Sequence, residues 1–539
     1  PVRTVNTELA QNRLSVSLGF SGLKESPVAS LDLAIGDTSI QGSYQVEPQQ
    51  LISWLDPIID ISALSSITEI NGSLSAEFKS EDRINTTLSA TTGRLGYNAY
   101  GAHDAGLRFS IQTFTTNPLD HIKILNGSYI RAGSLSYQDV SLGDARLNLV
   151  GDLALSADSW QYTGGFSSRE LEIHYQSQVL KLADIAGRLT SNADTLDISG
   201  DFSTARLPGQ FTFAIDHDFR KAAGQFDIRP VKKLNLHRDN SKLSQLLTPW
   251  PYAFDLYTGT LSLSSHASWS PGEAFRLTSG IKLDDGGGKI GEVLFSGLFL
   301  DHDLEILPRL RSPGVNSIRL GHLDSGITAS NISTDLEIQH ASSGTLPQFV
   351  ITGLHGEVLG GTFTADEFVY DLNKEINRFM ITASDIDLAA IVETQQLENI
   401  EITGRVDGTV PVVINDQGVR VEHGSFINRV REGIIRYRPA GGSDQLKQNP
   451  LTRVALDALE DFHYNHLSAD VNFTPEGILT INVQLKGTSP ELDTRRPVHL
   501  NINTEQNLLS LLKSLRFAEG VSANIDREVR RQYEKNQKQ

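Results

Sequence analysis

The most constraining feature of this sequence is an alternation of apolar and polar residues, interrupted only by glycines and short turn signals. It is clearest between residues 402 and 439. Apolar residues of one parity would leave a pleated strand on the same face. Those of the first run are Ile402, Val406, Val410, Val412 and Ile414, with Gly404 and Gly408 at the positions between them. The other parity is mostly polar, so the sequence predicts a strand with one apolar face.

The alternation resumes after residues 416–418, whose Asp-Gln-Gly sequence is typical of a tight turn. Further strands are expected to add apolar side chains to the same face. The residues predicted to lie on it are Val419, Val421, Ile435, Tyr437, Leu467, Val471, Phe473, Ile481, Val483, Leu485, Val498, Leu500 and Ile502. A bulge at Gly424 would reverse the facing of later residues in its strand, because side chains alternate with a period of two.

Similar short alternating runs recur along the whole chain. Examples are Leu14 to Phe20, Leu107 to Ile111, Leu147 to Leu155, Phe211 to Ile215 and Leu336 to Ile338. Turn-like pairs such as Asn71-Gly72 and Asn126-Gly127, and the glycines at 286–288, are expected to separate strands. The sequence therefore predicts an all-β fold of about 35 strands, an elongated, twisted and curled antiparallel sheet with a hydrophobic interior.

Helical periodicity is confined to a few short segments. These are residues 48–64, 241–247, 387–397, 453–462 and 505–515. They interrupt the strands instead of alternating with them, which disfavours a parallel α/β sheet. We expect short helices that cap or brace the sheet.

Composition excludes several classes of function. The formal net charge is −18, with 65 acidic and 47 basic residues, which opposes binding to nucleic acid or to an anionic membrane surface. Cysteine is absent, which removes disulfides, thiolate metal sites and cysteine nucleophiles. No apolar run is long enough for a membrane-spanning helix. The chain starts at Pro1 without a leader-like segment, and we expect its targeting segment to lie outside it.

Candidate catalytic and metal sites are weak. His463 and His466 lie near Glu460 and Asp461, but no third ligand is close in sequence, so we expect solvated polar residues. Residues 284–289, Asp-Asp-Gly-Gly-Gly-Lys, lack the spacing of a phosphate loop and are better explained as a hairpin turn. We expect no enzyme, no metal and no cofactor. Paired carboxylates that act on a polysaccharide stay an alternative, since sequence gives no distances.

The apolar face itself allows two interpretations. In a closed sandwich or solenoid it would be an ordinary core, as in an adhesin-like structural protein. In an open trough it would expose far more apolar surface than a soluble monomer usually shows, and an apolar ligand should occupy it. Lipid acyl chains fit, because a 16-carbon chain that crosses water unprotected faces roughly 12 kcal/mol. A small dicarboxylate would find no partners on such a face.

Residues 350 to 517 resemble the C-terminal region of the YdbH family, within the AsmA-like group of bacterial envelope proteins. Three segments carry the resemblance: ITASDIDLAAIVETQQLENIEITGRVDGTVPVVI, then GVRVEHGSFINRVREGIIRYRP, then ALDALEDFHYNHLSADVNFTPEGILTINVQLKGTSP followed by PVHLNINTEQNLLSLLKSLRF. Their serial order over about 170 residues is specific. Earlier residues are similar to the family mainly in their general pattern of short alternating runs. An exception is WSPGEAFRLTSGIKLDDGG near residue 269, which resembles its middle region.

The resemblance implies a periplasmic bridge of strands that carries phospholipid in a hydrophobic groove between the inner and outer membranes. It implies inner-membrane anchoring by a segment absent from this chain. It also implies a small outer-membrane lipoprotein partner, YnbE-like, that adds a strand beside Val498, Leu500 and Ile502. The expected parts are residues 1–235 and 236–380 as N-terminal and middle groove, 381–516 as the C-terminal groove segment, and 517–539 as a polar helix or tail.

Overall fold

The computed structural model describes residues 3–507 apart from gaps at 21–27, 48–63, 69, 81, 98–99, 117–119, 138–139, 157–158, 176, 205–208, 238–240, 251–252, 292, 326, 341–345, 395–398, 430–431, 439–449, 491 and 493–496. Within these residues the chain forms 33 strands, all assigned to one antiparallel sheet, and two α-helices. The predicted all-β class is confirmed.

The chain packs as two units, Pro1–Gly280 and Ile281–Gln539, and strand β19 (Arg276–Ile290) crosses the division. The four-part division expected from the sequence stays a prediction, since these units reflect internal packing alone. The predicted segment 517–539 lies outside the described residues, as does almost all of the predicted helix at 48–64.

Strands of the first unit pair mainly with their neighbours in sequence. The order is β1-β2-β3-β4-β6-β7, then β7 to β15 in sequence, then β18. Short strands β5, β16 and β17 pair with β7, β18 and β12. The bounds are β1 Arg3–Ala10, β2 Arg13–Phe20, β3 Ala29–Ile35, β4 Ser39–Val46, β5 Leu64–Ile67, β6 Ile70–Ser80, β7 Arg83–Tyr97, β8 Tyr100–Phe114, β9 His121–Tyr137, β10 Val140–Leu155, β11 Trp160–Tyr175, β12 Gln178–Asn192, β13 Thr195–Thr204, β14 Gln210–Asp218, β15 Ala223–Pro230, β16 Leu234–Leu236, β17 Leu247–Thr248 and β18 Phe254–Trp269.

The second unit continues this antiparallel pairing, with more pairs between strands that are not consecutive in sequence. The order is β20-β21-β22-β23-β24-β26-β28-β29-β31-β32-β33, with β25 on β23, and β27 and β30 as a short pair beside β31. The bounds are β20 Val293–Leu307, β21 Asn316–Asp324, β22 Thr328–His340, β23 Pro347–Val358, β24 Gly361–Ala365, β25 Phe368–Asp371, β26 Asn377–Asp387, β27 Ile400–Ile402, β28 Arg405–Asn415, β29 Gly418–Asn428, β30 Gly433–Tyr437, β31 Phe462–Phe473, β32 Ile478–Thr488 and β33 Val498–Asn507.

The helices are short, as predicted. Helix α2 (Leu388–Thr394) and helix α4 (Pro450–Leu459) match the segments expected at 387–397 and 453–462. The segment predicted at 241–247 forms one turn of 3-10 helix, η1 (Leu243–Gln245). Residues 505–507 of the helix predicted at 505–515 belong to β33 instead, and the rest lies outside the described residues.

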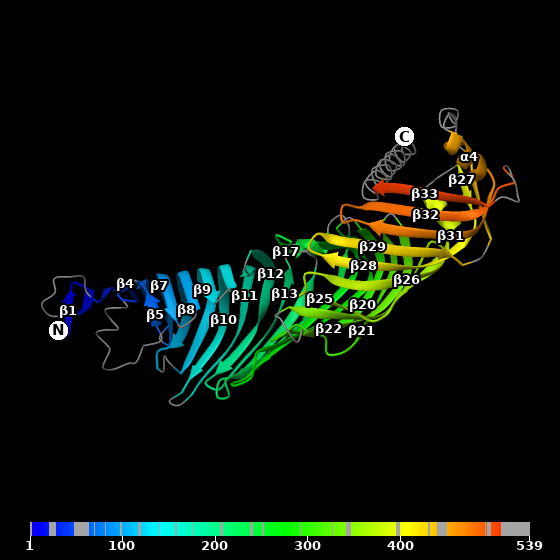
Figure 1. Cartoon of the computed structure of the whole chain (residues 1–539). Helices are drawn as coiled ribbons and strands as arrows, with labels where there is room; N and C mark the ends of the chain where they lie inside the picture. The colour runs from blue at the N-terminus through cyan, green and yellow to red at the C-terminus, as the bar shows by residue number, and fades with distance from the viewer. Residues whose placement is uncertain are drawn as a thin grey trace, which may run out of the picture. The chain divides into compact units, whose positions relative to one another are not determined.

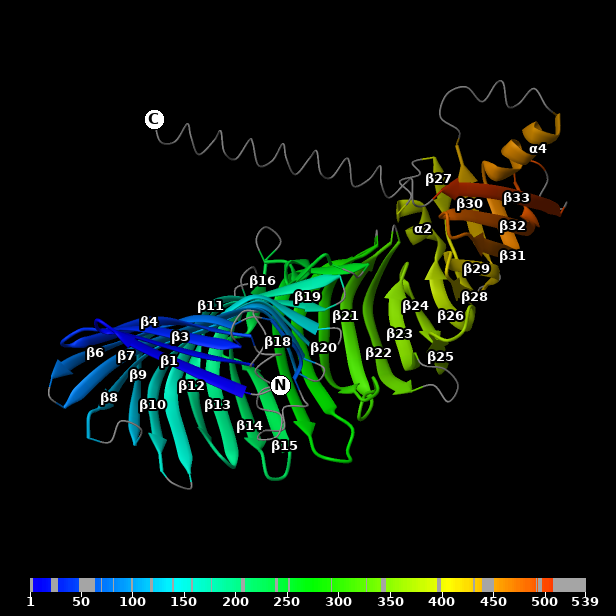
Figure 2. The same ribbon diagram turned by 90° about the vertical axis from the view of Figure 1, so that its left-hand side faces the viewer.

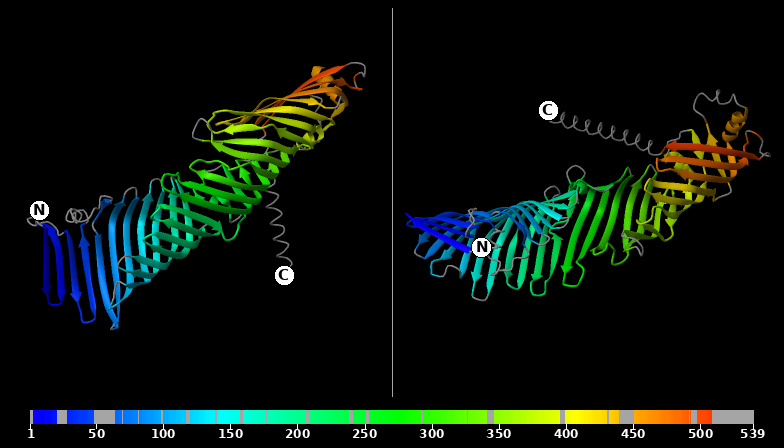
Figure 3. Two further views of the ribbon diagram at one scale, coloured as in Figure 1. Left: turned by 90° about the horizontal axis from the view of Figure 1, so that it is seen from below. Right: turned by 60° about the vertical axis from the view of Figure 1, so that its left-hand side comes forward.

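The long strands of the first unit bend along their length, so its sheet curls (Figures 2 and 3). In Figure 1 strands β7 to β13 lie side by side in sequence order. A residue with left-handed backbone lies inside many of the strands. Asp104 in β8, Asp144 in β10 and Asp184 in β12 have φ of 49°, 47° and 50°. Such residues re-aim the strand and change the parity of the side chains that follow.

Three segments that were expected to form turns lie inside strands instead. Asn71-Gly72 lies inside β6, Asn126-Gly127 inside β9, and residues 284–289 inside β19, where Asp285 has φ of 54°. Asn-Gly and Asp-Gly pairs suit a positive φ in the middle of a strand as well as in a hairpin, which explains Gly127, with φ of 94°, and Asp285. Asn71-Gly72 has no positive φ and continues its strand as ordinary extended backbone. The strands therefore have fewer breaks and are longer than the sequence suggested, and β9 covers 17 residues.

Candidate functional site

The strand register of the first unit brings apolar residues into rows that run across the sheet. Leu88 lies opposite Phe109, while Leu107 lies opposite Ile130 and Ile130 opposite Leu147. Leu88 is 36% exposed and Ile130 46% exposed, and the other three are half-buried. These two neighbouring rows meet on β8, where Phe109 and Leu107 are two residues apart, and together they form an accessible apolar surface, unlike a closed core.

Apolar rows persist across the points where strands bend. In β10, Leu147 lies opposite Ile130, and beyond Asp144 the apolar position is Leu142, opposite Leu135. Leu147 and Leu142 have opposite parity, so simple alternation fails at Asp144. Both strands change parity together, which keeps the pairing intact.

A comparable row crosses the second unit through residues expected from the sequence. Val412 lies opposite Phe379 on β26 and Val421 on β29, Val421 lies opposite Phe473 on β31, and Phe473 lies opposite Leu479 on β32. Figure 1 shows these strands side by side in yellow to orange. One row of five apolar side chains thus spans five strands.

The bulge anticipated near Gly424 lies one residue earlier. The pairing of β29 with β31 shifts between Val421 and Gly424, and His423 has φ of 57°. Because the extra residue changes parity, Val421 and the later Phe426 lie on the same face. Beyond the bulge, the even-numbered residues of β29 therefore lie on the apolar face.

One end of these strands is closed by a hydrophobic core. Ile386, Val406, Phe462 and Tyr464 belong to it and are at most 4% exposed. Helix α2 contacts β27 and helix α4 contacts β30, and both helices lie beside these short strands (Figure 2). This end of the apolar face is covered by the same chain.

The residues predicted to line the face fall into two groups. Within the core or packed against it are Ile402, Val406, Ile435, Leu467, Val483, Leu485, Val498, Leu500 and Ile502. Outside this core are Val410, Val412, Ile414, Val419, Val421, Tyr437, Val471, Phe473 and Ile481. Of the second group Val412 is buried, Val419 is 45% exposed and the rest are half-buried. The second group is the better candidate for contact with a ligand.

The first predicted run is two strands and not one. Ile402 ends β27, where it pairs with Ile435 of β30, whereas Val406 lies in β28 opposite Ile386. Between them Gly404 has φ of 126°, and its carbonyl accepts a hydrogen bond from the backbone N–H of Leu388. The alternation of apolar and polar residues continues from β27 into β28, so the sequence did not reveal the break between the two strands.

Sequence reasoning missed the accessible rows of the first unit, including Leu88, Leu107, Ile130 and Leu147. Their alternation was visible, but the assignment to one face required the cross-strand register. The signal available in the sequence was a run of apolar residues of one parity before Asp144 or Asp184 and a run of the other parity after it.

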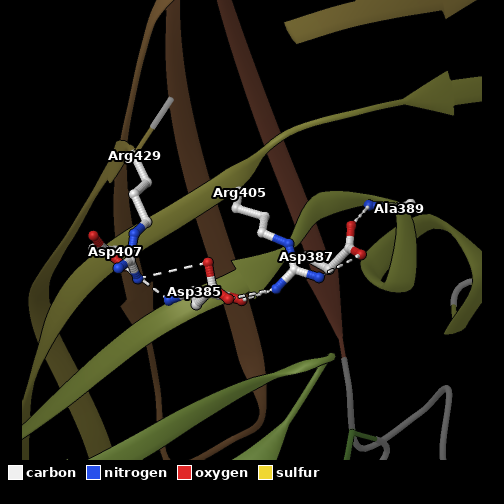
Figure 4. Close-up of polar contacts among 6 residues, drawn as sticks. All are labelled: Asp385, Asp387, Ala389, Arg405, Asp407 and Arg429. Atoms are coloured by element: carbon white, nitrogen blue, oxygen red, sulfur yellow. Dashed lines mark hydrogen bonds and ion pairs between the residues drawn. The ribbon is translucent and has the colours of Figure 1, made fainter. Parts of the chain in front are cut away.

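A charged cluster surrounds Asp385, at the register shift of β26 (Figure 4). Arg405 Nη1 lies 2.5 Å from Asp385 Oδ2, and Arg405 Nη2 lies 3.7 Å from Asp387 Oδ2. Arg429 Nη1 lies 3.5 Å from both Asp385 and Asp407. Asp385 itself has φ of 60°, and its backbone N–H donates to Asp407 Oδ1 at 2.8 Å.

The same cluster connects to helix α2. Asp387 Oδ1 accepts a hydrogen bond from the backbone N–H of Ala389 at 2.9 Å, which satisfies a donor of the first helical turn. With three carboxylates and two guanidinium groups largely paired with one another, the cluster is a structural brace.

The two histidines considered as metal ligands lie on β31. His463 Nε2 is 3.2 Å from Asp461 Oδ2, and Arg436 Nε donates to Asp461 Oδ1 at 2.9 Å. The Arg436 hydrogen bond, followed by that of His463, lowers the pKa of Asp461. In the described part of the chain, no three His, Asp or Glu side chains are placed to hold a metal ion. None of the described helices is long and apolar enough to cross a membrane.

Fold and face together define a class of protein: an all-β protein with a large open antiparallel sheet and an accessible apolar surface along its strands. The chain belongs to the YdbH-like family, whose model, described as intermembrane phospholipid transport protein YdbH, matches residues 10–530. It is 22% identical over 294 residues to the probable phospholipid transport protein YdbH of Escherichia coli (strain K12), a match that covers 53% of this chain and 32% of that protein. The match thus spans about a third of the relative's length. No solved structure matches the chain.

Proposed function

We propose that the apolar face binds the acyl chains of phospholipids, as part of an intermembrane phospholipid transport protein that bridges the inner and outer membranes through the periplasm. The observations that support this are the accessible apolar residues from Leu88 to Leu147 in the first unit and the row from Phe379 to Leu479 in the second, which is half-buried apart from the buried Val412. Family membership supplies the ligand class.

The energetics favour a continuous apolar surface as the path. Each CH₂ group moved from hydrocarbon into water costs about 0.8 kcal/mol, so a lipid that stays on aliphatic side chains avoids most of the barrier. Such a path needs no catalytic step, and we propose a transport protein that is not an enzyme.

The first test compares the accessible and closed parts of the face. Val410 is half-buried, whereas Leu485 is 1% exposed inside the core. We expect Val410→Asp to reduce copurified phospholipid, measured by native mass spectrometry, with little loss of thermal stability. Leu485→Asp should unfold the protein, because burying an unpaired carboxylate costs about 4 kcal/mol or more.

The outcome of that comparison separates transport from a purely structural role. Wild-type protein that carries no phospholipid from its native envelope would contradict the proposal. So would a Val410→Asp variant that retains the wild-type lipid content at unchanged stability, since a charge on the path should expel an acyl chain.

The edge of the sheet at β33 offers a site for a partner strand. Val498, Leu500 and Ile502 lie opposite Gly487, Leu485 and Val483 of β32, and among the described strands β33 pairs with β32 alone. A strand edge presents N–H and C=O groups that another chain can pair with. We propose that a small outer-membrane lipoprotein adds a strand here, and that an inner-membrane anchor lies outside this chain.

Photocrosslinking in intact envelopes tests the edge. Probes at His499, Asn501 and Asn503, whose side chains point away from the core face, should capture a small lipoprotein. A probe at Asp470 is the matched control, because β31 is flanked by β29 and β32. Capture of nothing along β33, or equal capture at Asp470, would refute strand addition.

A further inference from the structure

Aromatic side chains on the apolar face repeatedly lie opposite glycines of the neighbouring strand. The pattern occurs in both units and involves tyrosine, phenylalanine and tryptophan. Six examples are Tyr44 with Gly72, Phe166 with Gly187, Phe213 with Gly200, Trp269 with Gly224, Phe363 with Gly356 and Phe426 with Gly408.

In each pair the ring leans across the neighbouring strand and covers the glycine. A Cβ added at Gly356 would lie 2.5 Å from Cζ of Phe363, and one at Gly187 would lie 2.6 Å from Cζ of Phe166. Real carbon atoms in contact lie at about 3.5–4.0 Å. The ring therefore occupies the space that any larger residue's Cβ would need.

Adjacent pairs extend the effect over several strands. Phe166 of β11 covers Gly187 of β12, and Phe213 of β14 covers Gly200 of β13, so the two rings approach to 6.3 Å between centroids. Two glycines side by side thus let two rings from strands three positions apart cover the sheet between them.

These rings belong to the same face as the apolar rows. Phe166 lies opposite Leu149. Phe363 lies opposite Ala383, which in turn lies opposite Gly408, two residues from Val410 on β28. Phe363 is half-buried, which leaves part of its ring accessible from that face.

We propose that the cross-strand glycines keep these rings flat on the apolar face and thereby set the clearance that a lipid chain has above it. The inference rests on the proposed function. An alkyl chain on the face needs carbon contacts at about 4 Å, whereas a ring that stands upright would occupy the layer where the chain lies. The glycines are positioning residues that act through the rings.

A plain stabilising role is the competing explanation. Cross-strand aromatic pairs, including those over glycine, contribute to sheet stability without any ligand. A glycine replacement that lowers stability would not distinguish the two roles. Removal of the ring in the same variant, with lipid crosslinking and melting temperature measured together, does distinguish them.

Gly356 is the best position for the test. The three atoms nearest to an added Cβ are Cζ and Cε1 of Phe363 and Cγ1 of Ile332, all of them side-chain atoms. At Gly187 the backbone carbonyl of Ser199 is also in the way, so a replacement there would disturb the sheet itself. Gly165 is a matched control, because a Cβ there meets its nearest atoms at 3.6 Å.

The experiment uses the full chain and phosphatidylethanolamine vesicles that contain a phospholipid with a photoactivatable acyl chain. We expect Gly356→Ala to lose lipid crosslinking, and the double variant Gly356→Ala/Phe363→Ala to regain it. Gly165→Ala should behave as wild type. Melting temperatures are measured in parallel; under the structural explanation lipid crosslinking would fall and recover only together with the melting temperature, whereas the clearance role predicts a loss of crosslinking at a near-wild-type melting temperature.

Each outcome decides the question. Unchanged crosslinking in Gly356→Ala, or a double variant as impaired as the single one, would overturn the clearance role while the lipid-binding function stands. Wild-type protein without any crosslinking would remove the proposed function as well. If Gly356→Ala does not fold, Phe363→Ala alone decides: crosslinking at or above the wild-type level supports the proposal, and a loss refutes it.

Discussion

Tyr464 shows how a single residue closes one end of the apolar face. It is 2% exposed, its ring covers Gly433 on the opposite strand, and its hydroxyl donates to the carbonyl of Thr403 at 2.7 Å. Burial raises its pKa to about 12, because an ionised phenolate would lose its hydration. The buried phenol thus joins β31 to the segment between β27 and β28.

This pKa predicts an alkaline limit to stability. The unfolded pKa is about 10, so the contribution of Tyr464 is fully present below pH 10 and is lost as pH rises through 12, by about 3 kcal/mol in all. Tyr464→Phe should cost about 1 kcal/mol at neutral pH, yet show a smaller fall in unfolding free energy between pH 10 and 12. Urea unfolding across this range measures both, with exposed Tyr175→Phe as the control. Parallel falls in wild type and Tyr464→Phe would contradict the assignment.

At the scale of the element, the left-handed residues inside strands decide which later side chains reach the apolar face. Asp385 in β26 is the best-braced example, since its carboxylate pairs with Arg405 and Arg429 while its backbone N–H donates to Asp407. The bulge moves Ile386 and Leu388 to the core face, where α2 begins. Local charge pairing therefore fixes the point where the sheet gives way to its capping helix.

The brace should be measurable as a salt-dependent contribution. Arg405 is 42% exposed and its partners 44% and 33%, so Arg405→Gln should lower the unfolding free energy by about 1 kcal/mol, and by less in 1 M NaCl, where charges are screened. Lys79→Gln, which breaks the single exposed pair with Glu77, is expected to have the smaller effect. An equal loss for the two variants, or one that salt leaves unchanged, would argue against a network.

At the scale of the whole molecule, most strands pair with a near neighbour in sequence, and one face of each unit is apolar. Exposed apolar surface normally promotes self-association. The net charge of −18 opposes it through repulsion between copies of the chain. The same acidic surface disfavours adsorption to anionic bilayers, which leaves apolar contacts as the route by which a phospholipid would engage the protein.

The sequence determined the all-β class, the turn at residues 416–418, the two short helices and the apolar parity of strands such as β28, because a period of two is a local property of the chain. Only the tertiary structure decided that Val406 and Leu485 lie in a closed core while Val410 and Ile481 lie outside it. It also showed that Asn126-Gly127 bends a strand without ending it, and that Phe363 covers Gly356. These features depend on register and on helices packed from distant segments, and no alternation along one strand encodes which residue of another strand lies opposite.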